Sequence, residues 1–249
     1  MALSLFREGK ITIWVENIGS GRLFPITNIP AEHPSWSPDG RRIVFHSIDP
    51  ETFTSTIFIV RDDGSRLREV RKGGVNPAWS PVGNKIALSF QNNIWIVNTD
   101  GSNPTFLTLE GYNDFPSWSP DGKKIVYCAD GELAMVDIKS GIIEEILKDR
   151  YWKGYPTFSP DGSKVAFVSN RGGRYDIWIV GVDGKGLERV TDDPEREFYP
   201  QWLKEKEIYY LREEGKIRNV WKVVLEEVKP SPKKKRKAPQ KEARRIRGF

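Results

Sequence analysis

The segment PSWSPDG occupies residues 34–40 and recurs unchanged at residues 116–122. Looser copies are PAWSPVG at 77–83, PTFSPDG at 156–162 and PQWLKEK at 200–206. Successive first prolines are separated by 43, 39, 40 and 44 residues. An interval close to forty residues, kept along most of a 249-residue chain, is typical of a repeat protein in which each copy is one supersecondary unit.

Apolar runs follow each copy in a fixed order. The first set alternates as strands do and comprises residues 41–47, 84–90, 123–129, 163–169 and 206–212. The second set is rich in β-branched and aromatic residues and comprises 57–65, 94–102, 133–141, 177–185 and 220–228. A short last strand is expected at 68–72, 105–109, 144–148 and 188–192. Four antiparallel strands in a unit of this length predict the blade of an all-β propeller.

The Pro-x-Trp segment is expected to be the innermost strand of each blade, because proline is tolerated where no ladder donor is needed. Large rings then recur at one equivalent position, where they would fill the space between neighbouring twisted sheets. These rings are Trp36, Trp79, Trp118, Phe158 and Trp202.

The Ser-Pro-Asp-Gly corner would turn the chain into the second strand, with proline presetting φ and glycine accepting a left-handed conformation. Its repeated Asp39, Asp121 and Asp161 could be metal ligands or turn residues that bind their own backbone. We favour turn residues, since identical positions spread around a ring diverge from one another.

These motifs resemble the WD40-like repeats of TolB-type β-propellers, most clearly in PTFSPDGSKVAFVSNRGGRYDIWIVGVDGKGLERVT at 156–191. Similar repeats occur in the propeller domains of prolyl-oligopeptidase-like enzymes. The resemblance spans about residues 10–228 and implies a partner-binding platform. Val82 replaces the motif's aspartate, Phe158 replaces its tryptophan, and the copy at 200–206 lacks the whole corner.

The number of blades depends on how the two ends of the repeat region are counted. One hairpin, at 10–17 and 22–28, precedes Pro34, and three strands follow Pro200. We favour six blades, two of them incomplete, over five blades with surplus strand. The propeller would occupy residues 1–228, and the N-terminal hairpin would lie beside the C-terminal unit to close the ring.

Composition agrees with one soluble domain in which 38% of residues are hydrophobic. No apolar run reaches membrane-spanning length, and Arg7 and Glu8 interrupt the apolar N-terminus too early for a secretory signal. Cys128 is the one cysteine and is expected to be buried in a strand, so no disulfide can form within the chain. We expect a cytoplasmic protein, or a nuclear one if the source is eukaryotic.

Residues 229–249 carry ten Lys or Arg and one Glu, whereas residues 1–228 carry 29 basic and 33 acidic side chains. Such a proline- and lysine-rich tail is expected to be disordered. Its basic run resembles a nuclear-import signal and also suits nucleic acid or an anionic surface. A solvated extension without a binding role is the alternative. The residues of this run are Lys233, Lys234, Lys235, Arg236 and Lys237.

Motifs of catalysis are missing from the sequence. It has no Gly-x-Ser-x-Gly elbow, no phosphate-binding glycine loop, no paired-cysteine site and no His-Glu-x-x-His motif. Of its two histidines, His46 lies in an apolar strand and is expected to be structural. We therefore expect a protein that is not an enzyme and needs no cofactor or metal.

Three classes of function remain open because the fold alone does not choose among them. The first is a monomeric scaffold that binds a protein or peptide through its loop face or channel mouth. The others are a carbohydrate-binding or lyase-like propeller and a nucleic-acid or anionic-surface binder that uses the tail. The candidate partner-binding residues precede the inner-strand prolines, and they are His33, Asn76, Phe115, Tyr155 and Tyr199.

Any binding of DNA or RNA by the chain is predicted to be indifferent to sequence and to weaken steeply with added salt, because phosphate contacts release counterions. Removal of residues 229–249 should abolish it. A gel-shift titration at several salt concentrations, with and without the tail, measures both effects. Salt-resistant binding by residues 1–228 alone would contradict the prediction.

Overall fold

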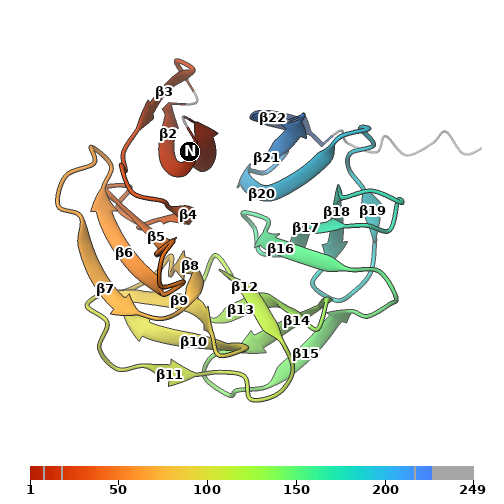
Figure 1. The fold of residues 1–249 in the computed structure, drawn as a ribbon. Coiled ribbons are helices and arrows are strands. Elements are labelled where there is room, and N and C mark those ends of the chain that lie inside the picture. Colours follow the sequence, from red (N-terminus) through yellow and green to blue (C-terminus); the bar gives the residue numbers. More distant parts are fainter. Residues whose placement is uncertain (8, 18, 216, 226–249) are drawn as a thin grey trace, which may run out of the picture.

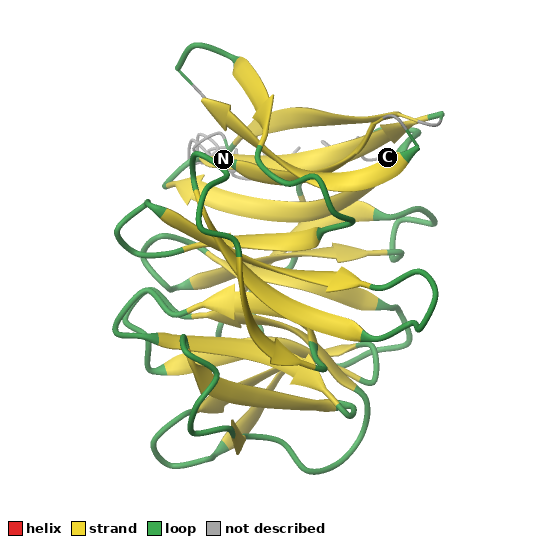
Figure 2. Cartoon of the chain, turned by 60° about the vertical axis from the view of Figure 1, so that its left-hand side comes forward, coloured by secondary structure: helices red, strands yellow, loops and turns green. Residues whose placement is uncertain are grey.

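The protein is described by a computed structural model that covers residues 1–7, 9–17, 19–215 and 217–225. Within these ranges the chain forms strands joined by turns and loops and contains no helix (Figure 2). The strands make six small antiparallel sheets arranged around a centre (Figure 1). The sequence-based prediction of an all-β, six-bladed propeller is therefore confirmed. The predicted basic tail at 229–249 lies outside the described residues.

Four blades are complete, and in each the strands follow one another from the centre outward. Blade 2 consists of β4 (Glu32–Trp36), β5 (Arg42–Ile48), β6 (Ser55–Arg61) and β7 (Arg68–Lys72). Blade 3 consists of β8 (Val75–Trp79), β9 (Lys85–Phe90), β10 (Asn93–Asn98) and β11 (Thr105–Phe106). Blade 4 consists of β12 (Asn113–Trp118), β13 (Lys124–Ala129), β14 (Glu132–Asp137) and β15 (Ile143–Leu147). Blade 5 consists of β16 (Lys153–Phe158), β17 (Lys164–Ser169), β18 (Asp176–Gly181) and β19 (Glu188–Arg189).

The two end blades have three strands each in the described residues. Blade 1 consists of β1 (Ala2–Arg7), β2 (Lys10–Asn17) and β3 (Arg22–Pro25). Blade 6 consists of β20 (Arg196–Lys204), β21 (Glu207–Glu214) and β22 (Ile217–Val224). Blade 6 keeps an inner Pro-x-Trp strand, β20, and its fourth-strand position is not filled by any of the described residues. The sequence had indicated the hairpin β2–β3 but not β1.

The inner-strand rings pack between blades as expected. Trp79 and Trp118 are buried and lie in apolar clusters shared with the preceding blade. The indole N–H of Trp118 also donates to the carbonyl of Ala78 in the inner strand of blade 3 (3.0 Å). Because each ring removes apolar area from water on two sheets at once, it holds neighbouring blades together. Trp36, Phe158 and Trp202 occupy the corresponding clusters.

The repeated aspartates are turn residues. The hydroxyl groups of Ser37, Ser119 and Ser159 donate to Asp39, Asp121 and Asp161, and a backbone N–H two residues further on donates to each carboxylate as well. The serine hydroxyl that donates to Asp161 is the leading cause that lowers its pKa to about 2. These carboxylates therefore stabilise the turn between the first two strands.

A buried threonine identifies the third strand of several blades. The N–H of Ile94 in β10 donates to Oγ1 of Thr108, and that of Ile177 in β18 donates to Oγ1 of Thr191, each at 2.9 Å. In blade 1 the N–H of Ile13 in β2 donates to Oγ1 of Thr27 in the same way (2.9 Å). Strand β2 therefore occupies the third position of a blade, counted from the centre outward. Strand β1, which pairs with β2, occupies the second position.

Blade 1 consequently has no inner strand within the described residues. Strand β1 has β2 as its one neighbour in the sheet, and its other edge faces the centre of the ring. In blades 2 to 5 the corresponding edge is paired with the Pro-x-Trp strand.

The ring is not closed by strand pairing in the described part of the chain. Blades 1 and 6 lie side by side, yet their strands belong to separate sheets (Figure 1). Instead, Leu3 and Leu5 of β1 pack against Leu211 of β21. The expectation that the N-terminal hairpin lies beside the last unit is correct, but closure comes from apolar side chains because each end builds its own sheet.

We predict that Thr108→Val lowers the free energy of unfolding by about 1–3 kcal/mol, because it leaves the buried N–H of Ile94 without an acceptor. Chemical denaturation measures the loss. Thr105→Val in the exposed strand β11 is the matched control and should change stability by less than about 0.5 kcal/mol. Equal effects of the two substitutions would refute the role of Thr108.

Candidate functional site

The residue before each inner-strand proline has an unusual backbone conformation. Its φ is 53° or 54° in all five blades that have an inner strand, and the pairing register shifts by a bulge at the same point. A positive φ costs a residue with a side chain roughly 1–2 kcal/mol. The five residues concerned are His33, Asn76, Phe115, Tyr155 and Tyr199.

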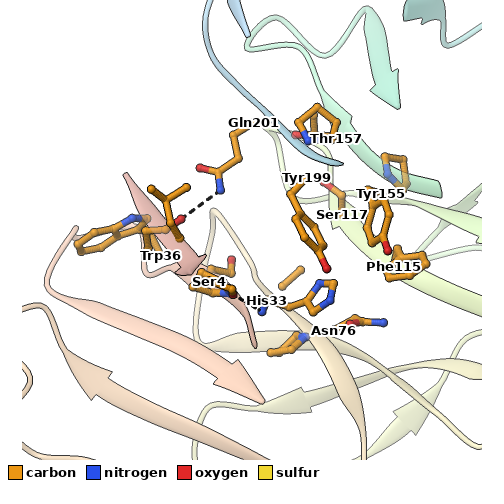
Figure 3. Close-up of a pocket in the computed structure, with 18 of the residues that line it drawn as sticks. Ser4, His33, Trp36, Asn76, Phe115, Ser117, Tyr155, Thr157, Tyr199 and Gln201 are labelled. Atoms are coloured by element: carbon orange, nitrogen blue, oxygen red, sulfur yellow. Dashed lines mark hydrogen bonds between the residues drawn. The ribbon is translucent and has the colours of Figure 1, made fainter. Parts of the chain in front are cut away.

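The bulges bring these side chains together at the centre of the ring (Figure 3). The Phe115 and Tyr155 ring centroids lie 4.2 Å apart, and the Tyr155 and Tyr199 centroids 4.5 Å apart. The His33 ring meets the edge of Tyr199 at 4.8 Å and stacks on Phe115 at 5.8 Å. Four rings from four blades thus form one cluster across the channel, which we call the aromatic plug.

Two of the five residues before the prolines form hydrogen bonds to the second strand of the preceding blade. The N–H of His33 donates to Oγ of Ser4 in β1 (3.0 Å). The N–H of Asn76 donates to Nδ1 of His46 in β5 (3.3 Å), and burial lowers the pKa of His46 to about 4. His46 is therefore neutral near pH 7 and accepts this bond, as expected for a structural residue.

Asn76 differs from the other four residues because it is buried. Its side-chain amide donates to Oδ1 of Asp114 in the next blade (2.5 Å), and the N–H of Phe115 donates to the same oxygen (2.7 Å). Asp114 therefore links two of the five positions. No sequence pattern indicated this contact, because Asp114 lies one residue before a position that varies from blade to blade.

A cavity of about 320 Å³ lies against the plug. All five predicted residues line it, together with the five inner-strand prolines. The residues that follow the prolines were not predicted to line a site, although the repeat itself marks this position. These further lining residues are Ser35, Ala78, Ser117, Thr157 and Gln201.

The cavity extends to the open edge of blade 1, since Ala2, Leu3 and Ser4 also line it. The side-chain amide of Gln201 donates to the carbonyl of Ala2 across the seam (3.3 Å; Figure 3). The walls thus combine rings, proline faces and small hydroxyl groups with residues of β1. Such a surface suits an apolar side chain flanked by backbone hydrogen-bonding groups.

The charged groups that are buried outside the cavity form ion pairs with other side chains of the blades. Lys153 is fully buried, and its ammonium donates to Glu132 (2.6 Å) and Asp149 (3.0 Å). Glu197 is equally buried, and burial raises its pKa to about 6. None of these side chains lines the cavity. Within the described residues, no three His, Cys, Asp or Glu side chains lie close enough together to hold a metal ion.

Other predictions concern Cys128, the tail and the membrane. Cys128 is buried in β13 as expected, and burial raises the pKa of its thiol to about 12. The proposed import or nucleic-acid residues Lys233, Lys234, Lys235, Arg236 and Lys237 lie outside the described residues. In the part of the chain that the structure covers, no helix is long and apolar enough to span a membrane.

The fold and channel define a six-bladed β-propeller of repeated Pro-x-Trp units. The chain belongs to the TolB beta propeller domain family, whose model matches residues 1–136. It is 26% identical over 206 residues to the uncharacterized protein Atu1656 of Agrobacterium fabrum, covering 77% of this chain and 69% of that protein. It is 27% identical over 146 residues to the uncharacterized peptidase YuxL of Bacillus subtilis, covering 54% of this chain and 21% of the peptidase.

Solved structures show the same architecture. A putative TolB from Agrobacterium tumefaciens superposes with a TM-score of 0.71 at 25% identity, covering 87% of this chain and 80% of that one. TolB from Acinetobacter baumannii superposes with a TM-score of 0.73 at 18% identity, covering 90% of this chain and 60% of that one. An oligogalacturonate lyase in complex with manganese superposes with a TM-score of 0.61 at 14% identity, covering 90% of this chain and 74% of that one. The last two likenesses concern the fold alone.

The left-handed backbone at Phe115 predicts an inverted order of stability for two substitutions. Phe115→Gly should be more stable than Phe115→Ala by about 1–2 kcal/mol, because only alanine retains the cost of a positive φ. Denaturant titration compares the two. At Ser117 in the same strand, which has no positive φ, glycine should be less stable than alanine by roughly 0.5–1 kcal/mol. The ordinary order at both sites would refute the assigned conformation.

Proposed function

We propose that the protein is a non-catalytic scaffold that binds an extended segment of a protein partner in its central channel. The observation that carries this proposal is the cavity of about 320 Å³ beside the aromatic plug. Its rings and prolines offer apolar contact area, while Ser4, Ser117 and Thr157 offer hydroxyl groups. Rings next to a few polar groups are the composition found at the centre of protein interfaces.

The construction of the plug supports the proposal. Four rings are held at positive φ and pack on one another, and the backbone of His33 is also anchored to Ser4 of blade 1, so their positions are set before a partner arrives. A preformed site loses less conformational entropy on binding. Membership of the TolB beta propeller domain family is consistent with a binding role.

An enzymatic role has less support than a binding role. The match to a peptidase covers 21% of that protein, and the likeness to a lyase rests on the fold. The charged residues Lys153 and Glu197 are buried in ion pairs outside the cavity. Binding of nucleic acid or an anionic surface through residues 229–249 is a separate proposal, which the salt titration above addresses.

The test removes two rings of the plug. We expect Tyr155→Ala combined with Tyr199→Ala to weaken partner binding by at least about 1 kcal/mol for each ring. The partner would be captured from native extract with the full chain, and its affinity for each variant would be measured by titration calorimetry.

The matched control combines Leu109→Ala with Ile142→Ala, which removes two side chains that are 74% and 61% exposed. The control should bind as the unmodified chain does. Since Tyr155 and Tyr199 also touch the apolar clusters of blades 5 and 6, melting curves of both variants are needed. Unchanged binding by a folded ring variant would reject the channel as the site, and binding lost only with residues 229–249 would assign it to the tail.

A further inference from the structure

Three aromatic rings that do not line the cavity lie together where the inner strands of blades 5 and 6 begin. They are Trp152 just before β16, Tyr175 just before β18 and Phe198 in β20. The Trp152 and Tyr175 ring centroids lie 5.5 Å apart, and the Tyr175 and Phe198 centroids 6.4 Å apart. Each ring is partly exposed, and the two blades are neighbours in the ring of sheets (Figure 1). We call these three residues the mouth cluster.

The mouth cluster is continuous with the aromatic plug but separate from the cavity. The Trp152 ring contacts Tyr155 at 5.9 Å, and the Phe198 ring contacts Tyr199 at 6.2 Å. Tyr155 and Tyr199 line the cavity, whereas none of the three rings of the mouth cluster does. The chain therefore presents a second aromatic surface outside the channel.

Backbone contacts hold the mouth cluster in place. The N–H of Trp152 donates to Oδ1 of Asn170, and the N–H of Glu197 donates to the carbonyl of Tyr175, each at 2.9 Å. A Cβ on Gly154 would lie 2.3 Å from the Trp152 ring, so only glycine leaves room for this tryptophan. The corresponding positions of the other blades with an inner strand carry side chains, and these are Glu32, Val75, Asp114 and Phe198. The rings are therefore ordered before a partner arrives.

Three exposed arginines flank the mouth cluster. Arg174 directly precedes Tyr175, and the guanidinium carbon of Arg196 lies 5.8 Å from the Tyr175 ring centroid. Arg150 lies two residues before Trp152. Among the described residues, no Asp or Glu forms an ion pair with any of the three. Arg174 and Arg196 can therefore offer bidentate hydrogen bonds to a carboxylate.

Most acidic side chains of this surface already have cationic partners. The segments 148–153, 170–176 and 192–198 contain six Asp or Glu residues. Five of them form ion pairs, namely Asp149 with Lys153 and Arg171, Asp176 and Asp192 with Arg189, and Asp193 and Glu197 with Arg212. The sixth, Glu195, is half-buried. The charge that remains for a ligand is therefore positive, with three arginines against one glutamate.

We propose that the mouth cluster and its flanking arginines bind an acidic segment of a protein partner. Tryptophan, tyrosine and arginine are the residues enriched at the energetic centres of protein interfaces. Carboxylates of the segment would pair with Arg174 and Arg196, while its apolar side chains would contact the rings. The inference goes beyond the proposed function, because it needs no segment in the channel.

Single-stranded nucleic acid suits this surface less well. The Trp152 ring meets Tyr175 at 83° and Tyr155 at 69°, so the rings offer no row of parallel faces on which successive bases could stack. Carboxylates also lie among the arginines, and residues 1–228 carry 33 acidic against 29 basic side chains. A strand with a phosphate at every nucleotide would meet those carboxylates, whereas a protein segment can place its charges only beside the arginines.

The charge contacts are tested with the labelled peptide Gly-Glu-Glu-Phe-Glu-Glu-Gly, titrated by fluorescence anisotropy against the full chain at low salt. We expect Arg174→Gln combined with Arg196→Gln to weaken peptide binding by about tenfold. The matched control combines Arg22→Gln with Arg41→Gln, two exposed arginines of blades 1 and 2, and should bind as the unmodified chain does. Both variants keep residues 229–249, so a loss confined to the first cannot come from the tail. Equal losses would overturn the inference.

The ring contacts are tested at Tyr175, whose side chain contacts other rings and Arg196. Tyr175→Ala should weaken binding of the same peptide by about tenfold, while Tyr175→Phe keeps the ring and should bind normally. Hydrogen exchange in residues 170–175 of the unmodified chain should slow when the peptide is saturating. Unchanged binding by a folded Tyr175→Ala variant would reject the mouth cluster as the site.

The captured partner distinguishes this inference from the proposed function. Loss of its binding in the Arg174 and Arg196 variant, but not in the Tyr155 and Tyr199 variant, supports the mouth cluster and rejects the channel. The reverse result leaves the channel proposal standing and overturns the inference. A single-stranded oligonucleotide that binds more tightly than the peptide, and loses affinity with the two arginines, would also overturn it, because the ligand would then be nucleic acid.

Discussion

The structure depends on one large ring that each inner strand inserts between two twisted sheets. Trp79 and Trp118 show the arrangement, since each is buried in a cluster shared with the preceding blade. Blades 2 to 6 all contribute such a ring, so the stability of every blade is coupled to its neighbours, as in other repeat proteins.

Proline next to this ring has a second effect on the centre of the molecule. It removes one N–H from the inner edge, and the residue before it adopts a positive φ at a bulge. That conformation directs His33, Phe115, Tyr155 and Tyr199 toward one another. The inner strand that builds each blade therefore also builds the wall of the cavity, which explains why the candidate site lies at the start of each repeated segment.

Much of this organisation could be predicted from the sequence because it is local and repeated. The interval near forty residues indicated blades, the alternating runs indicated strands, and the Asp-Gly turns were placed correctly. The five residues before the prolines were brought to one place by repetition alone. Strand β1 was missed because ALSLFR follows no Pro-x-Trp copy and therefore looks like an isolated apolar stretch. Its identity as a second strand required the bond from Ile13 to Thr27. The contacts of Asn76 with Asp114 and of Gln201 with Ala2 depend on distant register and left no local pattern.

The seam gives the ring an unusual mechanical property. Every other pair of neighbouring blades is joined by covalent chain, whereas blades 1 and 6 meet through Leu3, Leu5 and Leu211 with strands that belong to separate sheets in the described residues. A force that pulls the two ends of this region apart is resisted there by side-chain packing and not by a ladder of backbone hydrogen bonds. Within the described residues the propeller is therefore a split ring, in which a widening of the seam would leave the internal pairing of all six sheets intact.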